Sequence, residues 1–344
     1  PSGVGELDGG PAAVARFLGL CERLEAAVDE CLAQYPCSRL GLTSIREGLV
    51  LLDAAGEPCW VSGNALLDDE RMLAVPIGEA VVATLLPEVL AGRPQAATLL
   101  SLPGFVAWRL TGQWGITVSE LSALGLWRTP AGSEERVQQL LAAVPLVGVG
   151  EPLGSCRRHP GTSVYLAGTD EQASHHGAGV GRDGAWGLAT ATFWSLTAPA
   201  SEGADLPPMV RSIPAVPPYS ATVSIIGYRW GPYLQEAWSG GRPRLPERLP
   251  RWAVGTVLRC LREAGPLEPE RLIAAAAADI RAALQRLAAV GQVPAPPRLV
   301  VHGGGLTGLP ELTRAILAAV GLPWVELAGD ATQLGCHLVG RGLR

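Results

Sequence analysis

The chain has 344 residues and a formal net charge of −5, from 27 basic and 32 acidic side chains. An acidic chain argues against a nucleic-acid partner held through phosphate contacts. The sequence contains no lysine, which excludes both a P-loop phosphate lysine and a lysine Schiff base. The length favours two domains.

The cysteines and histidines form no familiar metal or disulfide pattern. No pair among the seven cysteines has CxxC spacing, and no pair of histidines lies in an HExxH motif. We therefore expect reduced thiols in a cytoplasmic protein. No apolar run is long enough to cross a bilayer, and no signal peptide is visible, so we expect no membrane partner.

The first half of the chain mixes helices with short strands. Its predicted elements are a helix at 11–35, strands at 39–44 and 49–52, and helices at 77–90 and 97–110. Glycine and proline punctuate residues 144–161, which suggests a domain boundary there. We place it between residues 156 and 157.

The second half has the same mixed character. Its predicted elements are a strand at 164–166, a short helix from residue 170, a strand or hairpin at 186–196, a proline-rich loop at 199–224, helices at 252–263 and 269–290, a strand at 299–301, a helix at 310–320, a strand at 324–327 and a helix at 331–339. Strands and helices alternate in both halves, so the predicted fold class is α/β.

Asp170 follows the predicted strand at 164–166. Thr169 and Gln172 have the spacing of a capping box. Asp170 is then the first helical residue, where the positive end of the helix favours a carboxylate. The residues alone allow either a functional carboxylate or a simple N-terminal cap.

A glycine turn joins the strand at 299–301 to the helix at 310–320, with glycines at positions 303, 304, 305 and 308. Glycines before a helix leave free N–H groups that suit a nucleotide, although a tight turn without ligand fits equally well. The GxGxxG pattern with Glu326 after the next strand also fits a dinucleotide site. Too little chain follows Glu326 to finish even one mononucleotide-binding half.

Two charged stretches lie in the first half. Arg46 and Glu47 separate two apolar strands; they are either a solvated hairpin end or a pair that donates to and accepts from hydroxyl groups. Asp69 and Arg71 belong to a run that, taken alone, is typical of a solvated surface.

Four segments, in this order, resemble the FGGY carbohydrate kinases, which are ATP-dependent sugar and polyol kinases with two ribonuclease-H-like (actin-like) domains around a central cleft. They are LTSIREGLVLLDAAGEP at 42–58, followed by LLDDERM; SLPGFVAWRLTG at 101–112, followed by SELS; VYLAGTDEQASHHGAGV at 164–180; and the glycine turn at 298–327, followed by ATQLG. Together they cover most of the chain.

The resemblance implies roles for residues that match the family's motifs. Asp170 matches the catalytic aspartate. The implied substrate-binding residues are Arg46, Glu47, Asp69, Arg71 and Gln172. The implied nucleotide-binding residues are Thr190, Gly303, Gly304, Gly305 and Thr307.

The resemblance also implies ATP and Mg²⁺ as cofactors, a small sugar or polyol as substrate and a possible homodimer. It divides the chain into an N-terminal-like sugar-binding domain at 1–156 and a C-terminal-like catalytic and nucleotide-binding domain at 157–344.

The sequence departs from the family pattern at both phosphate-binding elements. The family begins with a hairpin carrying D-x-G-T, whereas GELDGGP at 5–11 resembles the stretch after that hairpin, so we expect an incomplete N-terminal domain. The family's second phosphate loop, GTS, is replaced by Ala189-Thr190-Ala191. These departures keep a non-catalytic sugar-binding or scaffold protein open as the alternative.

Overall fold

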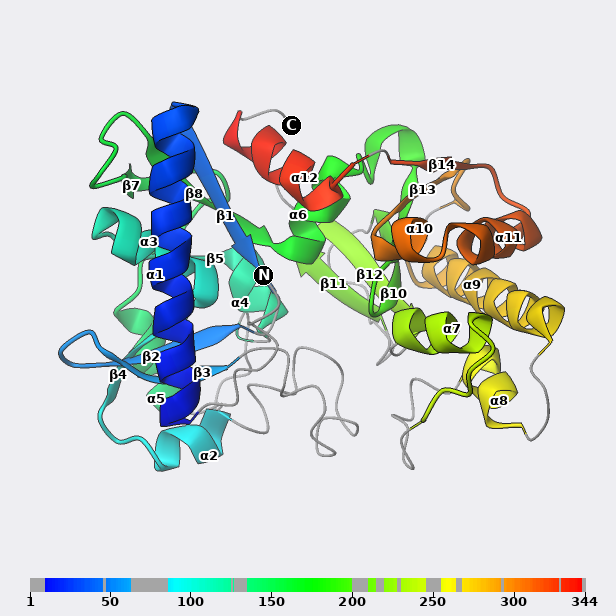
Figure 1. Ribbon diagram of the computed structural model, residues 1–344, viewed down its shortest axis with the longest axis horizontal. Coiled ribbons are helices and arrows are strands. Elements are labelled where there is room, and N and C mark those ends of the chain that lie inside the picture. The colour runs from blue at the N-terminus through cyan, green and yellow to red at the C-terminus, as the bar shows by residue number, and fades with distance from the viewer. Residues whose placement is uncertain are drawn as a thin grey trace. The chain divides into compact units, whose positions relative to one another are not determined.

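The computed structural model (Figure 1) divides into two compact units. Unit 1 is Pro1–Ala173 with Cys336–Arg344, and unit 2 is Ser174–Gly335. The structure describes residues 10–45, 48–62, 86–124, 126, 135–199, 210–214, 220–227, 230–245, 255–263, 268–291, 294–327 and 329–341.

The described residues of unit 1 form three small sheets. The first has the order β1 (Arg39–Ser44), β8 (Ser163–Thr169) and β7 (Pro152–Ser155); β1 runs parallel to β8 and β7 antiparallel to it. The second is antiparallel, in the order β3 (Pro58–Ser62), β2 (Leu49–Asp53) and β4 (Ala96–Ser101). The third pairs β5 (Ile116–Thr117) with β6 (Leu146–Val147).

The helices described within unit 1 are α1 (Pro11–Gln34), α2 (Leu86–Ala91), α3 (Leu102–Thr111), α4 (Val118–Ala123) and α5 (Glu135–Ala142). The long helix α1 packs on β3, and α3 packs on β1 and β8. Their apolar faces meet in a core where the rings of Phe17 and Phe105 lie 5.2 Å apart. Two further helices, α6 (Asp170–Gly177) and α12 (Ala331–Gly340), cross the division between the units.

Unit 2 is built on one mixed sheet of six strands. Their order is β11 (Val210–Pro214), β12 (Ser220–Gly227), β10 (Trp194–Pro199), β9 (Trp186–Thr190), β13 (Leu299–His302) and β14 (Trp324–Glu326). Neighbours from β11 to β9 are antiparallel, whereas β9, β13 and β14 are parallel.

Helices pack against this sheet and one another. They are α7 (Trp230–Trp238), α8 (Thr256–Arg262), α9 (Pro269–Gly291), α10 (Gly304–Gly308) and α11 (Pro310–Val320). The long helix α9 contacts β10, β12, α8 and α11. The predicted α/β class is confirmed.

Two predicted elements are wrong. Residues 97–101 belong to strand β4, and the helix begins only at Leu102. Pairing with β2 holds this apolar run extended, and the Ser101 hydroxyl accepts a hydrogen bond from Gly104 N (3.0 Å), which starts α3. The predicted loop at 199–224 contains strands β11 and β12, which pair in register with each other. Of the helix predicted at 77–90, residues 77–85 lie outside the described residues.

The boundary between the two structural units, after Ala173, lies later in the chain than the predicted domain boundary at 156/157. Strand β8 lies in unit 1 because it pairs with β1, and the division falls inside α6. The assignment of sugar-binding and catalytic roles to domains 1–156 and 157–344 stays a prediction.

Candidate active site

Asp170 lies where β8 ends and α6 begins in unit 1. The predicted capping box is present: Gln172 Oε1 accepts hydrogen bonds from Thr169 N (3.3 Å) and Thr169 Oγ1 (2.9 Å). Asp170 is partly buried, and its Oδ1 accepts a hydrogen bond from Glu171 N (2.8 Å). The first turn of α6 therefore presents a carboxylate at the positive end of the helix.

The carboxyl ends of two parallel strands meet beside this carboxylate. In the β1–β8 ladder, Ser44 is paired with Thr169, the residue before Asp170. Thr43 Oγ1 donates a hydrogen bond to Gly168 O (2.8 Å), which fastens the two strand ends together. This is the edge of a sheet at which α/β proteins commonly bind small ligands.

Gly168 is required at this edge. Its φ is +81°, and a Cβ there would lie 2.4 Å from Ser119 Oγ. The Ser119 hydroxyl in turn donates to Gln172 Oε1. The helix α4 thus contacts the start of α6 directly and orients the capping side chain.

Glu120 holds the beginning of α4 from inside the core. Its carboxylate accepts hydrogen bonds from Ser101 Oγ (2.7 Å) and from Thr117 N and Oγ1 (2.8 Å each). Burial raises the pKa of Glu120, whereas these hydrogen bonds act in the opposite direction. Neither Ser119 nor Glu120 was predicted to support the site, although the T-x-x-E spacing from Thr117 is itself a capping-box signal.

The four charged residues predicted to bind substrate, Arg46, Glu47, Asp69 and Arg71, lie outside the described residues. Gln172 is described: it is buried, and its Oε1 accepts from Thr169 and Ser119. Its predicted role as a substrate-binding residue stays a prediction.

The glycine turn lies in unit 2, after β13. Gly303 has φ +103° and ψ −179°, a region that only glycine adopts easily. A Cβ at Gly303 would lie 3.0 Å from Thr190 O, and one at Gly305 would lie 2.7 Å from Thr190 Cβ. The turn thus follows the end of β9 closely, as the register of His302 with Ala189 requires.

Thr190 is fully buried beneath this turn. Its hydroxyl donates to His302 O (2.9 Å), so its side chain joins the ends of β9 and β13. Gly304 and Thr307 are exposed, and Thr307 Oγ1 donates to Gly304 O (3.1 Å). A Cβ at Gly304 would have only Thr190 O as a neighbour, at 4.0 Å.

Two histidines that no sequence motif indicated lie behind the turn. His302 packs edge-on against His175, with ring centroids 5.4 Å apart, and His175 Nε2 lies 2.8 Å from Thr197 Oγ1. Burial, with a smaller contribution from His175, lowers the pKa of His302 to about 3. His302 is therefore neutral at pH 7 and puts no charge beneath the glycine turn.

The dinucleotide alternative finds little support in unit 2. Glu326, its candidate ribose-binding acid, accepts hydrogen bonds from Arg314 Nε (2.7 Å) and Nη2 (3.0 Å). The hydrogen bond from Arg314 lowers the pKa of Glu326. The sheet is mixed, whereas dinucleotide-binding domains have mostly parallel sheets.

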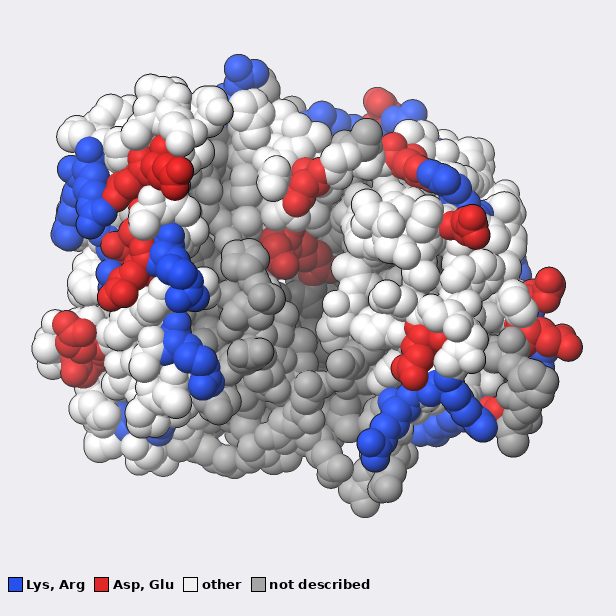
Figure 2. All heavy atoms as spheres, viewed as in Figure 1, with Lys and Arg blue, Asp and Glu red and all other residues white. Residues whose placement is uncertain are grey.

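Within the described part of the chain, no helix is long and apolar enough to span a membrane. The same residues contain no cluster of three or more His, Cys, Asp or Glu side chains that could hold a metal ion. Figure 2 shows acidic and basic side chains interspersed over the visible face. The expected absence of nucleic-acid partners stays a prediction.

Comparison with known proteins finds no matching family model and no matching curated protein. The structure nevertheless resembles solved carbohydrate kinases over most of its length. A xylulose kinase from Brucella ovis has a TM-score of 0.67 at 18% identity, covering 98% of this chain and 84% of its own.

Two further solved structures agree. For a xylulose kinase from Rhodospirillum rubrum the TM-score is 0.64 at 14% identity, with 96% of this chain and 82% of that chain covered. For a glycerol kinase from Plasmodium falciparum, solved with ADP, it is 0.63 at 12% identity, with 93% and 78% covered. The chain therefore has the fold of the carbohydrate kinases, and the resemblance seen in the sequence is confirmed at the level of the fold.

Proposed function

We propose that this protein is an ATP-dependent kinase that phosphorylates a hydroxyl group of a sugar or polyol. The observation that carries the proposal is the position of Asp170. It is a partly buried carboxylate at the start of a helix, beside the paired carboxyl ends of β1 and β8, in a chain with a carbohydrate-kinase fold.

Asp170 is the proposed general base. Phosphoryl transfer is catalysed mainly by positioning and electrostatic stabilisation. The role of Asp170 is to accept the proton of the attacking hydroxyl, for which the carboxylate has to be ionised. The N-terminal end of α6 favours that ionised form by about 0.3–1 kcal/mol.

Support for Asp170 comes from the hydrogen bonds around it. Thr169 and Ser119 both donate to Gln172 Oε1, so the first turn of α6 is fixed from two sides. Gln172, which holds this turn through its Oε1, is also a proposed substrate-binding residue. Arg46, Glu47, Asp69 and Arg71 are the proposed contacts to the substrate hydroxyls.

The glycine turn fits a nucleotide. Gly303, Gly304 and Gly308 are exposed, and a Cβ at Gly308 would have no neighbour within 4 Å. The backbone there is free to lie against a ligand. Gly303, Gly304, Gly305 and Thr307 are the proposed nucleotide contacts. Thr190, also a proposed nucleotide-binding residue, is buried and holds the turn in shape through its hydrogen bond to His302 O.

Bound ATP with Mg²⁺ would supply the phosphoryl group and neutralise its charge. Mg²⁺ in kinases keeps several waters and binds through one or two carboxylates and the phosphates. A protein cage of three acidic side chains is therefore not required.

One observation favours the alternative, a non-catalytic sugar-binding or scaffold protein. The side chain of Thr190, the one residue kept from the family's phosphate loop, is buried and donates to His302 O. That hydroxyl proton is engaged within the protein.

Sugar-dependent formation of ADP, measured across a panel of ketoses, polyols and sugar acids, tests the two functions. We expect turnover with at least one of them and its loss in Asp170→Asn. Asp183→Asn is the matched control, because Asp183 is exposed with φ 52°, a conformation that asparagine also tolerates. Sugar binding without ATP binding or turnover would support the non-catalytic alternative.

A further inference from the structure

Unit 1 contains a pocket of about 360 Å³ between α1, α3 and the turn after β7. Its lining residues are Glu25, Asp29, Trp108, Arg109, Leu110, Cys156, Arg157 and Arg158. The volume falls within the range of about 300–1,000 Å³ that is usual for small-molecule sites. All lining residues belong to unit 1.

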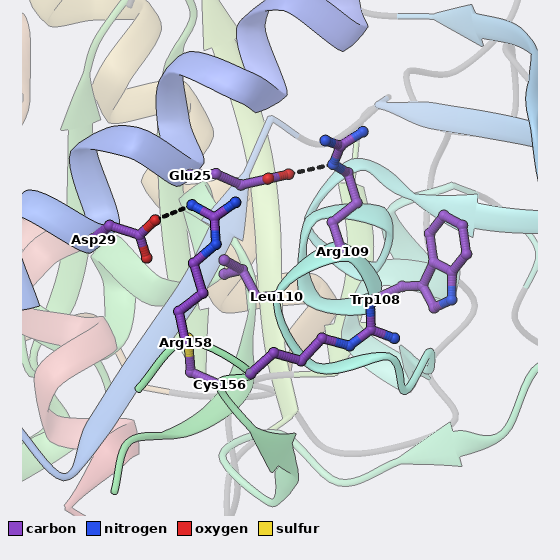
Figure 3. A pocket seen from close by; sticks show the side chains of 8 residues that line it. Glu25, Asp29, Trp108, Arg109, Leu110, Cys156 and Arg158 are labelled. Atoms are coloured by element: carbon purple, nitrogen blue, oxygen red, sulfur yellow. Dashed lines mark hydrogen bonds and ion pairs between the residues drawn. The ribbon is translucent and has the colours of Figure 1, made fainter. Parts of the chain in front are cut away.

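Two ion pairs form the rim of this pocket (Figure 3). Glu25 and Asp29, one turn apart on α1, point toward Arg109 and Arg158. Arg109 Nε donates to Glu25 Oε1, and Arg158 Nη1 donates to Asp29 Oδ2. Both carboxylates are therefore already matched by guanidinium groups.

Arg157 is the third guanidinium of the pocket. Within the described part of the chain, its side chain has no ion pair and no hydrogen bond. Its backbone N donates to Leu110 O (2.8 Å), which fixes the residue beside the end of α3. Among the described side chains that line the pocket, two carboxylates face three guanidinium groups, so the Arg157 guanidinium has no matching carboxylate there.

Gly112 makes room for that guanidinium. It is the C-cap of α3 with φ 81°, and a Cβ there would lie 2.1 Å from Arg157 Nη2 and 2.9 Å from Cζ. The guanidinium therefore lies close to the C-terminal end of the helix, where the dipole favours a positive charge. This contact places the group but provides no acceptor side chain for its N–H donors.

Apolar side chains complete the lining. Leu110 and Cys156 are buried, and Trp108 is partly buried. The pocket thus combines one unmatched planar cation with an apolar and aromatic wall. A guanidinium binds carboxylate and phosphate groups through paired N–H donors, which lysine cannot do.

We propose that this pocket is a second ligand site, which binds a small organic anion, a carboxylate or phosphate monoester with an apolar or aromatic body, through Arg157. It is separate from the candidate active site. Cys156 N donates to Thr162 O (2.8 Å), just before β8, whereas Asp170 follows the other end of that seven-residue strand. The strand spans about 23 Å. The inference does not depend on the kinase proposal.

Isothermal titration of the full chain with phenyl phosphate tests the site, with benzoate as the carboxylate probe and phenol as the uncharged control. We expect saturable binding of phenyl phosphate or benzoate at one per chain, and no saturation with phenol. Arg157→Gln should weaken the binding at least tenfold, which corresponds to about 1.4 kcal/mol. Arg157→Lys keeps the positive charge but lacks the paired N–H donors of the guanidinium, so it should give an intermediate affinity.

Arg244→Gln is the matched control, because Arg244 is an exposed arginine of unit 2. It should bind the probe as the unmodified protein does. Absence of saturable binding to the unmodified protein would overturn the proposal regardless of how the variants fold. Equal affinity in Arg157→Gln and the unmodified protein would overturn it as well, since the probe would then bind elsewhere.

Discussion

Neighbouring glycines of the turn after β13 should respond to alanine in opposite ways. Gly303 has a backbone conformation that costs a non-glycine residue about 1–3 kcal/mol. Its added Cβ would also lie 3.0 Å from Thr190 O and 3.1 Å from Thr190 N and C. Overpacking against a rigid backbone costs a further 1–3 kcal/mol or so. Gly303→Ala should therefore lower the free energy of unfolding by about 2–6 kcal/mol.

Gly304→Ala is the counterpart. Its Cβ would have a single neighbour at 4.0 Å, and Gly304 is the first residue of α10. Alanine in a helix is favoured over glycine by about 0.5–1 kcal/mol. The variant should be as stable as the unmodified protein or slightly more stable. Its methyl group would nevertheless lie on the exposed surface proposed for the nucleotide, and a similar overpacking would raise the Kd for ATP by roughly 5- to 160-fold.

Urea unfolding and calorimetric titration with ATP measure the two effects separately. Equal stability of Gly303→Ala and the unmodified protein would refute the assignment of strain to the turn. A Gly304→Ala protein that is as unstable as Gly303→Ala would refute the local geometry. A stable Gly304→Ala protein with unchanged ATP affinity would show that the turn is not the nucleotide-binding site.

Three further predictions concern buried contacts. Gly168→Ala should destabilise unit 1 by at least about 1 kcal/mol, because its Cβ would lie 2.4 Å from Ser119 Oγ. Gly161→Ala, whose Cβ would have no neighbour within 4 Å, should leave the stability unchanged in the same thermal unfolding measurement. In the unfolded chain His302 is protonated below about pH 6.5, whereas in the folded protein it stays neutral down to about pH 3. The free energy of unfolding should therefore fall with falling pH between these values, by up to about 1.4 kcal/mol per pH unit. His302→Phe should flatten this dependence, and an unchanged slope would count against the buried neutral imidazole. Burial raises the pKa of Glu120 above 4.5, so the contribution of Glu120 to the free energy of unfolding should decline as the pH rises above that value. In urea titrations over the same pH range, the stability of Glu120→Gln should depend less on pH.

Much of the candidate site could be predicted where a local signal sufficed. Thr169 and Gln172 have the capping-box spacing, and α6 begins at Asp170 as that spacing requires. The glycines of the turn also marked the connection between β13 and α11, although the helical turn α10 within them was not foreseen.

The wrong and missing predictions concern elements and contacts that depend on residues far away in the sequence. Residues 97–101 form a strand because β2 pairs with them, and the partner residues, from Leu52↔Thr98 to Leu49↔Ser101, lie 46 to 52 positions earlier in the chain. The proline-rich stretch at 199–224 contains two strands, of which β12 pairs not only with the neighbouring β11 but also with the earlier strand β10. The contact of Ser119 with Gln172 joins residues 53 positions apart, and the burial of His302 depends on the whole of unit 2. No local pattern encodes such contacts.

The most direct test of the central claim compares turnover of Asp170→Asn with that of the unmodified protein, both saturated with ATP, Mg²⁺ and the sugar found by the panel. If Asp170 accepts the hydroxyl proton, the Kd values should change little while the rate falls by about 10²–10⁴-fold. An Asp170→Asn protein that turns over at an undiminished rate with both ligands bound would contradict the account.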